Sequence, residues 1–290
     1  MTTGWHEVAA GVFQRRYEPC DVTVTAVVGA RGVAVVDTRC SLEEGEEIKR
    51  DIASFASVPV RWVVNTHSHL DHTWGNVAFT APYQQPPAQI WAHRSVPEVL
   101  TPDDPAVPFF LETFTDQGPE WQAKVAGLRI ARPTHLVDRH SVIDLGDRTV
   151  ELRWTGRAHT AGDLWVVVPD ADVVVAGDLI EEAGDPIWGP DSFPFEWPAT
   201  LDAALAFIGP DTVVVPGHGA PVDAAFVRAQ RELIASVAER IRELHGAGVH
   251  LSEGPSAGGW PIPEDRTRYA LARGYAHLDR LTASSTGSAR

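Results

Sequence analysis

The stretch NTHSHLDHTWGN at residues 65–76 decides the fold and the site that we expect. Three histidines and one aspartate fall within six positions, residues 67–72, which we call the histidine motif. The apolar residues 62–64 come directly before this stretch and are typical of a short buried strand. We therefore expect the histidine motif to lie in a loop at the end of that strand.

The spacing within the histidine motif predicts two neighbouring metal ions rather than one. His67 and His69 are two residues apart, so their side chains leave an extended chain on the same side. Asp71 and His72 are adjacent and diverge, so a single ion cannot easily bind all four side chains. We expect the first pair to bind one ion and the second pair to bind the other.

Three further residues of metal-binding type follow apolar runs downstream. They are His159, Asp178 and His218, which come at or shortly after residues 152–154, 173–177 and 213–217. Such runs predict strands, so these side chains would join the histidine motif where strands end. Glycines beside Asp178 and His218 let the backbone turn sharply where a side chain would crowd the ions.

The seven residues make a nitrogen–oxygen donor set without thiolates, which suits zinc and also iron or manganese. In one division the first ion takes His67, His69 and His159, the second takes Asp71, His72 and His218, and Asp178 bridges them. Each ion then keeps an open position for water, as catalytic sites do. Two ions about 3.5–4 Å apart would hold a bridging hydroxide that attacks an ester, thioester, amide, lactone or phosphoester.

The other segments predict helices packed on a sheet within one domain, residues 1–290. Residues 21–36 predict a hairpin, and residues 41–57 predict a helix that leads into the strand at residues 60–64. The C-terminal part predicts two helices within residues 222–282, the second over 264–281, and a disordered tail at residues 283–290.

Two aromatic segments are candidates for shaping the substrate site. Residues 101–127 could form a lid or a substrate wall, or a helical excursion whose aromatic residues pack on the core. Residues 187–197 are rich in aromatic residues and proline, and they predict a rigid apolar wall near the metals. Its candidate substrate contacts are Trp188, Phe193 and Trp197, which alternatively only anchor the loop.

The amino-acid composition limits the classes of molecule that the protein is expected to bind. The net charge of −15 disfavours nucleic acid and predicts a small-molecule substrate, and no basic run offsets that charge. No apolar stretch approaches the roughly 20 residues of a membrane helix, and the N-terminus lacks a secretory signal. Cys20 and Cys40 are the only cysteines, which fits a reducing cytoplasm. A monomer and a homodimer both remain open.

The histidine motif, followed in order by His159, Asp178 and His218, resembles the metallo-β-lactamase superfamily over roughly residues 10–222. The resemblance implies an α/β fold, a four-layer αβ/βα sandwich of two mixed β-sheets with outer helices and the metals at one edge. It supports the ligand division above and implies that Asp71 also acts in catalysis as a proton acceptor or donor. It further implies that Asp37, at the end of the second strand, orients the metal-binding loop.

Asp178 favours the glyoxalase II and lactonase types of this superfamily over true β-lactamases, which have a cysteine there or lack that ligand. We therefore predict a binuclear metal-dependent hydrolase of esters, thioesters or lactones, with two divalent ions, zinc before iron or manganese. The alternative is a mononuclear iron enzyme similar to persulfide dioxygenases. A β-lactamase or a phosphodiesterase ranks lower, and a non-catalytic binding protein would have lost ligands that are all present here.

Overall fold

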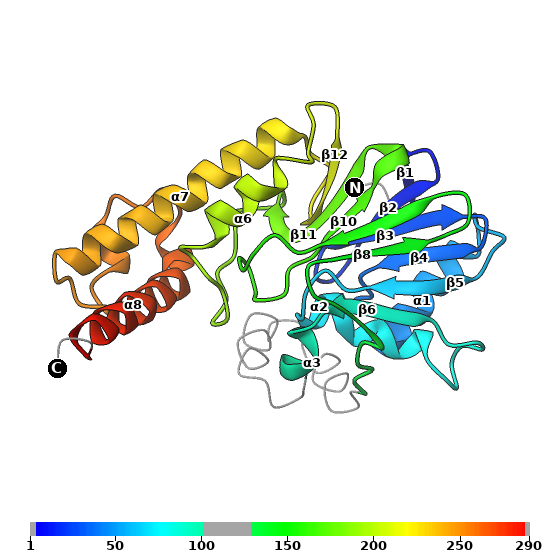
Figure 1. Ribbon diagram of the computed structural model, residues 1–290, viewed down its shortest axis with the longest axis horizontal. Coiled ribbons are helices and arrows are strands. Elements are labelled where there is room, and N and C mark those ends of the chain that lie inside the picture. The colour runs from blue at the N-terminus through cyan, green and yellow to red at the C-terminus, as the bar shows by residue number, and fades with distance from the viewer. Residues whose placement is uncertain (1–3, 101–128, 288–290) are drawn as a thin grey trace.

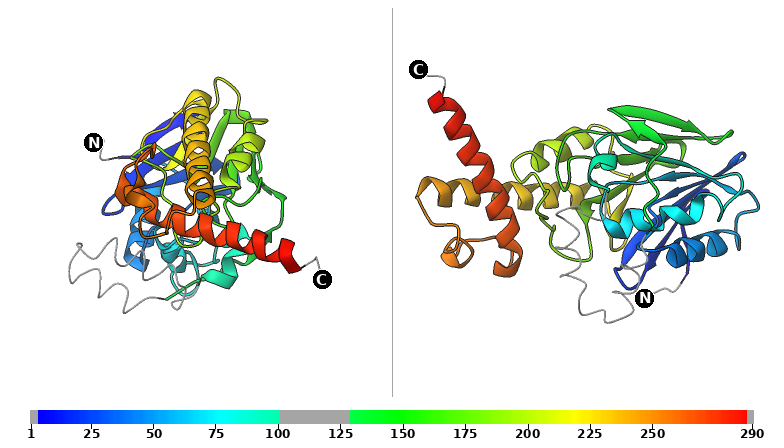
Figure 2. Two further views of the ribbon diagram at one scale, coloured as in Figure 1. Left: turned by 90° about the vertical axis from the view of Figure 1, so that its left-hand side faces the viewer. Right: turned by 90° about the horizontal axis from the view of Figure 1, so that it is seen from below.

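The computed structural model describes residues 4–100 and 129–287, with side chains described as far as Leu281. The lid expected at residues 101–127 therefore lies outside the described residues. Figures 1 and 2 show two β-sheets packed face to face with helices on their outer sides, and α7 and α8 extending from one side of this sandwich.

The first sheet has seven strands, in which neighbours run both parallel and antiparallel. They are β1 (His6–Ala9), β2 (Val12–Tyr17), β3 (Val22–Gly29), β4 (Gly32–Val36), β5 (Val60–Val64), β6 (Gln89–His93) and β7 (His135–Val137). Valine is frequent in the central strands β3, β4 and β5, because a β-branched side chain packs well on a pleated surface. The hairpin expected at residues 21–36 is present as β3 and β4.

The second sheet has five strands and is also mixed, with β11 and β12 parallel and the other pairs antiparallel. They are β8 (His140–Asp144), β9 (Thr149–Arg153), β10 (Trp165–Val168), β11 (Val173–Glu181) and β12 (Val213–His218). One residue pair, Val22 of β3 and His218 of β12, joins the two sheets. The joint between the sheets is therefore also the position of one expected metal ligand.

In the part of the chain that the structure describes, helical segments cover the outer faces of the sheets and connect their strands. They are α1 (Leu42–Ile52), α2 (Leu70–Thr73), η1 (Trp74–Phe79), α3 (Val96–Val99), η3 (Pro169–Ala171), α6 (Trp197–Ala204), α7 (Ala224–Gly246) and α8 (Glu264–Gly287), with a further short turn of 3-10 helix, η4 (Pro255–Ala257). None of the described helices combines the length and the apolar character that crossing a membrane requires.

The side chains of each central strand alternate between two different cores, which explains the four layers. Val33 and Val35 of β4 pack toward α1 and η1, whereas Ala34 of the same strand packs between the sheets. In β11, Val174 packs toward α6 and α7, and Val175 packs between the sheets. Because both faces of each sheet are covered, β4 is apolar over its whole length and β11 is apolar over residues 173–177. The predicted four-layer αβ/βα sandwich is confirmed.

Two helix boundaries differ from the prediction. Helix α1 ends at Ile52 instead of near residue 57, because the Ser54 hydroxyl donates to the carbonyl of Asp51 (2.6 Å) and competes with the helical ladder. Helix α8 continues to Gly287, so residues 283–287 are helical instead of belonging to a disordered tail. The segment after Leu281 holds no proline and no glycine before Gly287, so no residue stops the helix earlier.

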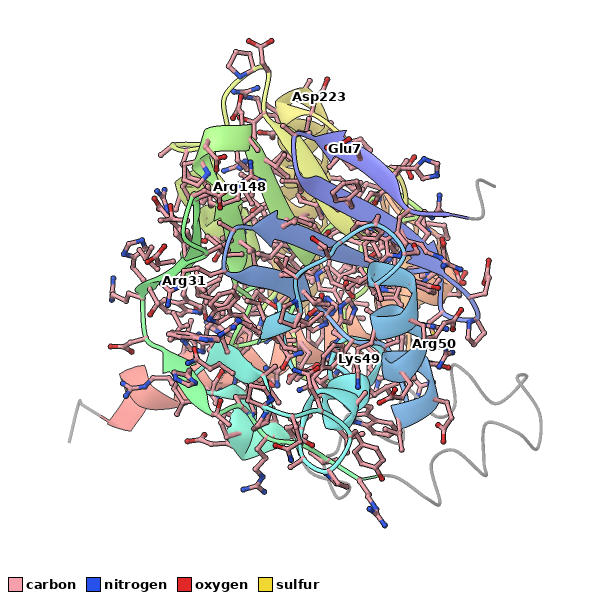
Figure 3. All side chains as sticks on the ribbon, turned by 90° about the vertical axis from the view of Figure 1, so that its right-hand side faces the viewer. Glu7, Arg31, Lys49, Arg50, Arg148 and Asp223 are labelled. Carbon is pink, nitrogen blue, oxygen red and sulfur yellow. The ribbon has the colours of Figure 1, made fainter. Side chains whose placement is uncertain are left out.

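The two sheets also contact each other at the end of the sandwich where β4 begins. The backbone N–H of Arg31 donates to the carbonyl of Leu145 (2.8 Å), and that of Ala30 donates to Asp147 (2.7 Å). Figure 3 labels Arg31 and Arg148 in this region and shows Lys49 and Arg50 on the outer helix α1. The parallel strands β4 and β5 end at the opposite edge, where the histidine motif begins.

Candidate metal centre

The histidine motif forms the connection from β5 into α2. His67 and His69 precede the helix, and Asp71 and His72 lie within it. All four side chains are buried. A turn of helix directly after an extended segment brings these four side chains, which come from six successive residues, toward one point.

Polar side chains form hydrogen bonds that stabilise the backbone of the histidine motif. The Asn65 side-chain amide donates to the carbonyl of His72 and to the Asn76 side-chain oxygen, both at 3.0 Å. The Thr38 hydroxyl donates to the same Asn76 oxygen (2.9 Å), and the Thr38 backbone N–H donates to the His72 carbonyl (3.0 Å). These bonds fix the backbone of the histidine motif.

Asp37 is a second support, as expected. One of its oxygens lies 2.8 Å from both His72 Nδ1 and the Thr66 hydroxyl, and the other accepts from the Thr66 N–H at 2.8 Å. The backbone of Asp37 has a φ of 66°, a conformation that is uncommon for a residue with a side chain. Such a conformation persists where surrounding contacts over-determine it, and Asp37 has hydrogen bonds on both carboxylate oxygens and on its backbone N–H, which donates to the Val64 carbonyl.

The second sheet brings His159, Asp178 and His218 to the histidine motif. The ligand-type atoms of His67, His69, His159 and Asp178 lie within 4.8 Å of one another, and so do those of Asp71, His72 and His218. Asp178 lies between the two groups: its Oδ2 is 3.4 Å from His159 Nε2, and its Oδ1 is 3.2 Å from His72 Nε2 and 3.6 Å from His218 Nε2. Either group could hold a metal ion.

In three histidines of the centre, Nδ1 points outward and makes a hydrogen bond, whereas Nε2 points toward the centre. His159 Nδ1 and His218 Nδ1 lie 3.0 Å from the carbonyls of Ile187 and Cys20, which only accept, so both must donate. The Thr66 hydroxyl donates to Asp37, so it accepts from His67 Nδ1 at 3.0 Å. In the neutral rings, the lone pairs therefore lie on Nε2 and face the centre.

Three buried polar atoms at the centre make no hydrogen bond among the described residues, although two of them lie 3.2 Å apart. They are His67 Nε2, His72 Nε2 and Asp178 Oδ1. Buried polar groups in proteins are normally hydrogen-bonded, and exceptions need a physical reason. Three such atoms, from two imidazoles and a carboxylate, fit a bound cation well.

The centre attracts positive charge. Burial opposes ionisation of Asp178, but His72 and His218 outweigh it and hold the pKa of Asp178 well below its usual range. Burial also opposes a charge on His72, but Asp178 and Asp71 raise the pKa of His72 well above its usual value. In contrast, burial lowers the pKa of His159 to about 4. Carboxylates that raise a neighbouring imidazole's pKa would attract a metal cation in the same way.

Glycines keep the centre open for the Asp178 carboxylate. A Cβ on Gly217 would lie 1.9 Å from Asp178 Oδ1, and a Cβ on Gly177 would lie 2.6 Å from the Thr66 side chain. Gly177 also has a φ of 54°, in the left-handed region that favours glycine. Gly217 and Gly177 are therefore required because neighbouring side chains lie too close to leave room for a Cβ atom.

A cavity of about 520 Å³, which we call the central cavity, opens directly onto this centre. Asp71, His159, Asp178 and His218 contribute to its wall. The remaining wall comes from the segment after β11, including Ile187 and Trp188, and from the start of α8, including Asp265, Arg266 and Tyr269. The centre is thus accessible to a small molecule through a partly apolar cavity.

The three aromatic candidates for substrate contact occupy three different environments. Trp188 lines the central cavity. Phe193 lines a separate cavity of about 340 Å³, the side cavity, and lies between the guanidinium groups of Arg157 and Arg273. Trp197 is fully buried and packs on Trp188 (ring centroids 5.7 Å apart), a placement that fits the alternative of an anchoring residue.

Sequence reasoning missed two acidic residues at the centre. Asp191 lies 3.1 Å from His69 Nε2 and so leaves His69 Nδ1 facing the centre. Glu181, the last residue of β11, is buried, lines the central cavity and groups with Asp178 and His218. Burial raises the pKa of Glu181 to about 8. Strict alternation would place Glu181 on the face opposite Asp178, so no sequence pattern indicated it.

Comparisons with known proteins agree with this architecture. The family model described as the Metallo-beta-lactamase superfamily matches residues 17–218. Human acyl-coenzyme A thioesterase MBLAC2 is 23% identical over 215 residues, which are 72% of this chain and 72% of the human protein.

Two solved structures share the fold. The sec-alkylsulfatase Pisa1 from Pseudomonas sp. superimposes with a TM-score of 0.72 and 19% identity over 94% of this chain. The match covers 49% of the sulfatase, so this chain spans about half of its length. A metallo-beta-lactamase from Pontibacter korlensis has a TM-score of 0.59 and 18% identity, with 81% of this chain and 99% of that protein covered.

Proposed function

We propose, from the premise that the chain belongs to the metallo-beta-lactamase superfamily, that this metal-dependent hydrolase cleaves acyl thioesters at a centre of two divalent ions. The observation that carries the proposal is the convergence of six donor side chains around a seventh, Asp178, with imidazole lone pairs facing inward. The similarity to a protein named as an acyl-coenzyme A thioesterase favours a thioester over a β-lactam.

The proposed ligands divide as the sequence suggested. His67, His69 and His159 would hold the first ion, Asp71, His72 and His218 the second, and Asp178 both. This donor set suits zinc, with iron or manganese as alternatives. When bound, two such ions lower the pKa of a water molecule toward neutrality and polarise a carbonyl oxygen.

The chain's own groups orient the centre and move the proton. Outer hydrogen bonds to Cys20, Ile187 and Asp37 hold three of the rings, so the inner nitrogens need no reorganisation. The Oδ2 atom of Asp71 lies 3.4 Å from His218 Nε2 and 3.5 Å from His72 Nε2. We assign to this oxygen the transfer of a proton from the attacking water to the leaving thiol.

The central cavity would receive the acyl group. Its wall near the centre includes Ile187 and Trp188, and Trp188 is held by Trp197 behind it. An apolar acyl chain gains by removing its surface from water against such a wall. Asp185 and Asp265 also line the cavity, so a thioester with a weakly charged leaving thiol fits better than one with phosphates deep in the cavity.

The proposal is tested by a substrate screen with the metal-loaded protein. Acyl thioesters, lactones, phosphodiesters and β-lactams are compared at equal concentration, and the product of each is quantified by chromatography so that all four classes are measured in the same way. The thioesters are expected to have the highest kcat/KM. Preferred hydrolysis of β-lactams or phosphodiesters, or one iron per chain with oxygen consumption, would contradict the proposal.

The acyl position is tested by Trp188→Ala against a series of acyl chain lengths. The substitution is expected to lower kcat/KM for long chains by about 10-fold, because the lost ring contributes roughly 1–2 kcal/mol of apolar contact. Phe193→Ala is the matched control, since Phe193 lines the side cavity. An unchanged chain-length preference in Trp188→Ala, or an equal change in both variants, would remove the central cavity as the acyl site.

The cellular compartment and the oligomeric state stay predictions. Cys20 and Cys40 are free thiols whose Sγ atoms lie 3.6 Å apart.

A further inference from the structure

Glu181 is a third carboxylate at the proposed centre that the seven-ligand scheme does not use. It ends β11 and lines the central cavity together with Asp71, Asp178 and His218. Its side chain is buried, with 6% of the residue's surface exposed. An ionised carboxylate in such a position is unfavourable unless a cation or a hydrogen-bond donor lies beside it, and Asp71 and Asp178 are carboxylates too.

An irregular pairing between β11 and β12 turns Glu181 toward the centre. From Gly177 to Glu181 β11 advances four residues, whereas its partner advances only two, from Pro216 to His218. Such an irregularity changes the face to which the following side chain points. Gln230 of α7 then holds the position, because its side-chain oxygen accepts from the Glu181 N–H at 2.9 Å.

The Glu181 carboxylate has no partner among the residues that the structure describes. Its backbone N–H makes the bond to Gln230, but no described side chain or N–H group donates to either carboxylate oxygen. No described lysine or arginine forms an ion pair with it. Its nearest ionisable neighbours are His218 and the like-charged Asp178, with which it forms a group of ligand-type atoms within 4.8 Å of one another.

We propose that Glu181 is an additional protein ligand of the second ion, the one shared by Asp71, His72 and His218. This inference rests on the two-ion centre of the proposed function and deepens it. A divalent ion at that position supplies the positive charge that the buried carboxylate lacks. The spacing of Glu181 to His218 is within the same limit that groups Asp71 with His218.

The added ligand makes the two ion positions chemically different. The first position has three imidazoles and one shared carboxylate, whereas the second has three carboxylates and two imidazoles. Imidazole-rich sites suit zinc, and carboxylate-rich sites suit manganese and other oxygen-preferring ions. The second position therefore favours Mn²⁺ relative to Zn²⁺ more strongly than the first position does.

The test is a metal titration of the full-length protein, followed independently of turnover. Protein stripped with a chelator is loaded with one equivalent of Zn²⁺ and titrated with Mn²⁺, and free Mn²⁺ is measured by its electron paramagnetic resonance signal. The wild type is expected to bind one Mn²⁺. Glu181→Gln is expected to weaken that Mn²⁺ by about 10-fold or more while the affinity for the first Zn²⁺ stays unchanged.

Asp185→Asn is the matched control, because Asp185 lines the same cavity and the substitution removes the same charge. It is expected to bind Mn²⁺ as the wild type does. Glu181→Asp keeps the carboxylate but shortens it, so an intermediate affinity is expected, and this variant carries the test if Glu181→Gln fails to fold.

Wild-type Mn²⁺ affinity in Glu181→Gln would overturn the inference, and so would an equal loss in Asp185→Asn. Failure of the thioester screen with normal metal binding would refute the proposed substrate alone. The two failures are therefore distinguishable.

Discussion

The two sheets supply the proposed centre in different ways. The first sheet supplies four donors from six consecutive residues, the histidine motif, after a single strand. The second sheet supplies one donor from each of three separate segments, at His159, Asp178 and His218. Local chain geometry thus suffices for one half of the centre, whereas the other half depends on how three segments pack together.

The two halves are also held by different kinds of contact. Side chains such as Asn65, Asn76 and Asp37 fix the histidine motif through hydrogen bonds. Backbone groups hold the second half: carbonyls orient His159 and His218, and the absence of a side chain at Gly217 makes room for Asp178. Substitutions that remove a side chain should therefore impair metal binding by the first half. In the second half, the most harmful substitutions should be those that add atoms.

The largest effect is expected from removing one metal donor of either half. Two such substitutions test whether both halves are equally necessary for turnover. Asp71→Ala and His218→Ala should each lower kcat/KM by about 10³-fold or more, since several kcal/mol of metal-assisted stabilisation is lost. Metal content is measured by elemental analysis, and circular dichroism checks that the fold is retained. Near-normal turnover in either variant would refute its assignment.

A smaller but still large effect is expected from added methyl groups. Gly217→Ala would place its Cβ 1.9 Å from Asp178 Oδ1, so it should expel that carboxylate and reduce bound metal. Gly75→Ala would place its Cβ 1.8 Å from the Thr38 carbonyl, a backbone group, and should lower stability instead. The free energy of unfolding should fall by about 1–3 kcal/mol or more in Gly75→Ala. Denaturant unfolding measures the loss of stability, and elemental analysis measures the loss of metal. If both variants lost the same stability and the same metal, the proposed difference between the two halves would be wrong.

The smallest effect comes from a support of the histidine motif. Asp37→Asn keeps the shape but removes a charged acceptor from His72 and Thr66, so metal affinity should fall by about 10–100-fold. Competition with a chromophoric chelator measures this affinity. Asp144→Asn, at the exposed end of β8, is the control and should leave the metal affinity unchanged. Unchanged affinity in Asp37→Asn would mean that the Asn65 and Asn76 bonds alone hold the motif.

The sequence alone was informative where local geometry determines position. Asp178 and His218 were predictable because each follows a run of valines that can only be a buried strand. Strands β1 and β2 were not predicted, since residues 6–17 mix apolar and polar residues without a clear alternation, and these strands form by pairing with each other and with β3. Propensity is a weak guide in such segments because cross-strand packing decides.

Within the site, the missed residues depend on long-range packing. Glu181 reaches the centre through an irregular pairing with β12, and neither strand's sequence reveals how the two align. Asp191 belongs to a loop and meets His69 across 122 residues of sequence. Trp197 was expected on a substrate wall with Trp188, but it begins a helix whose apolar side faces the core. Aromatic content alone does not distinguish these two environments.

The joint between the sheets has a consequence for the timing of biosynthesis. Each proposed ion takes donors from both sheets, and His218 is the last of the seven to be synthesised, 151 positions after His67. At about 5–20 residues per second, a ribosome needs on the order of 10–30 s to cover that interval. During this time the histidine motif has half of a binding site for each ion. His218 is a donor of the second site only, so its pairing with Val22 adds the last donor of that site at the step that closes the sandwich.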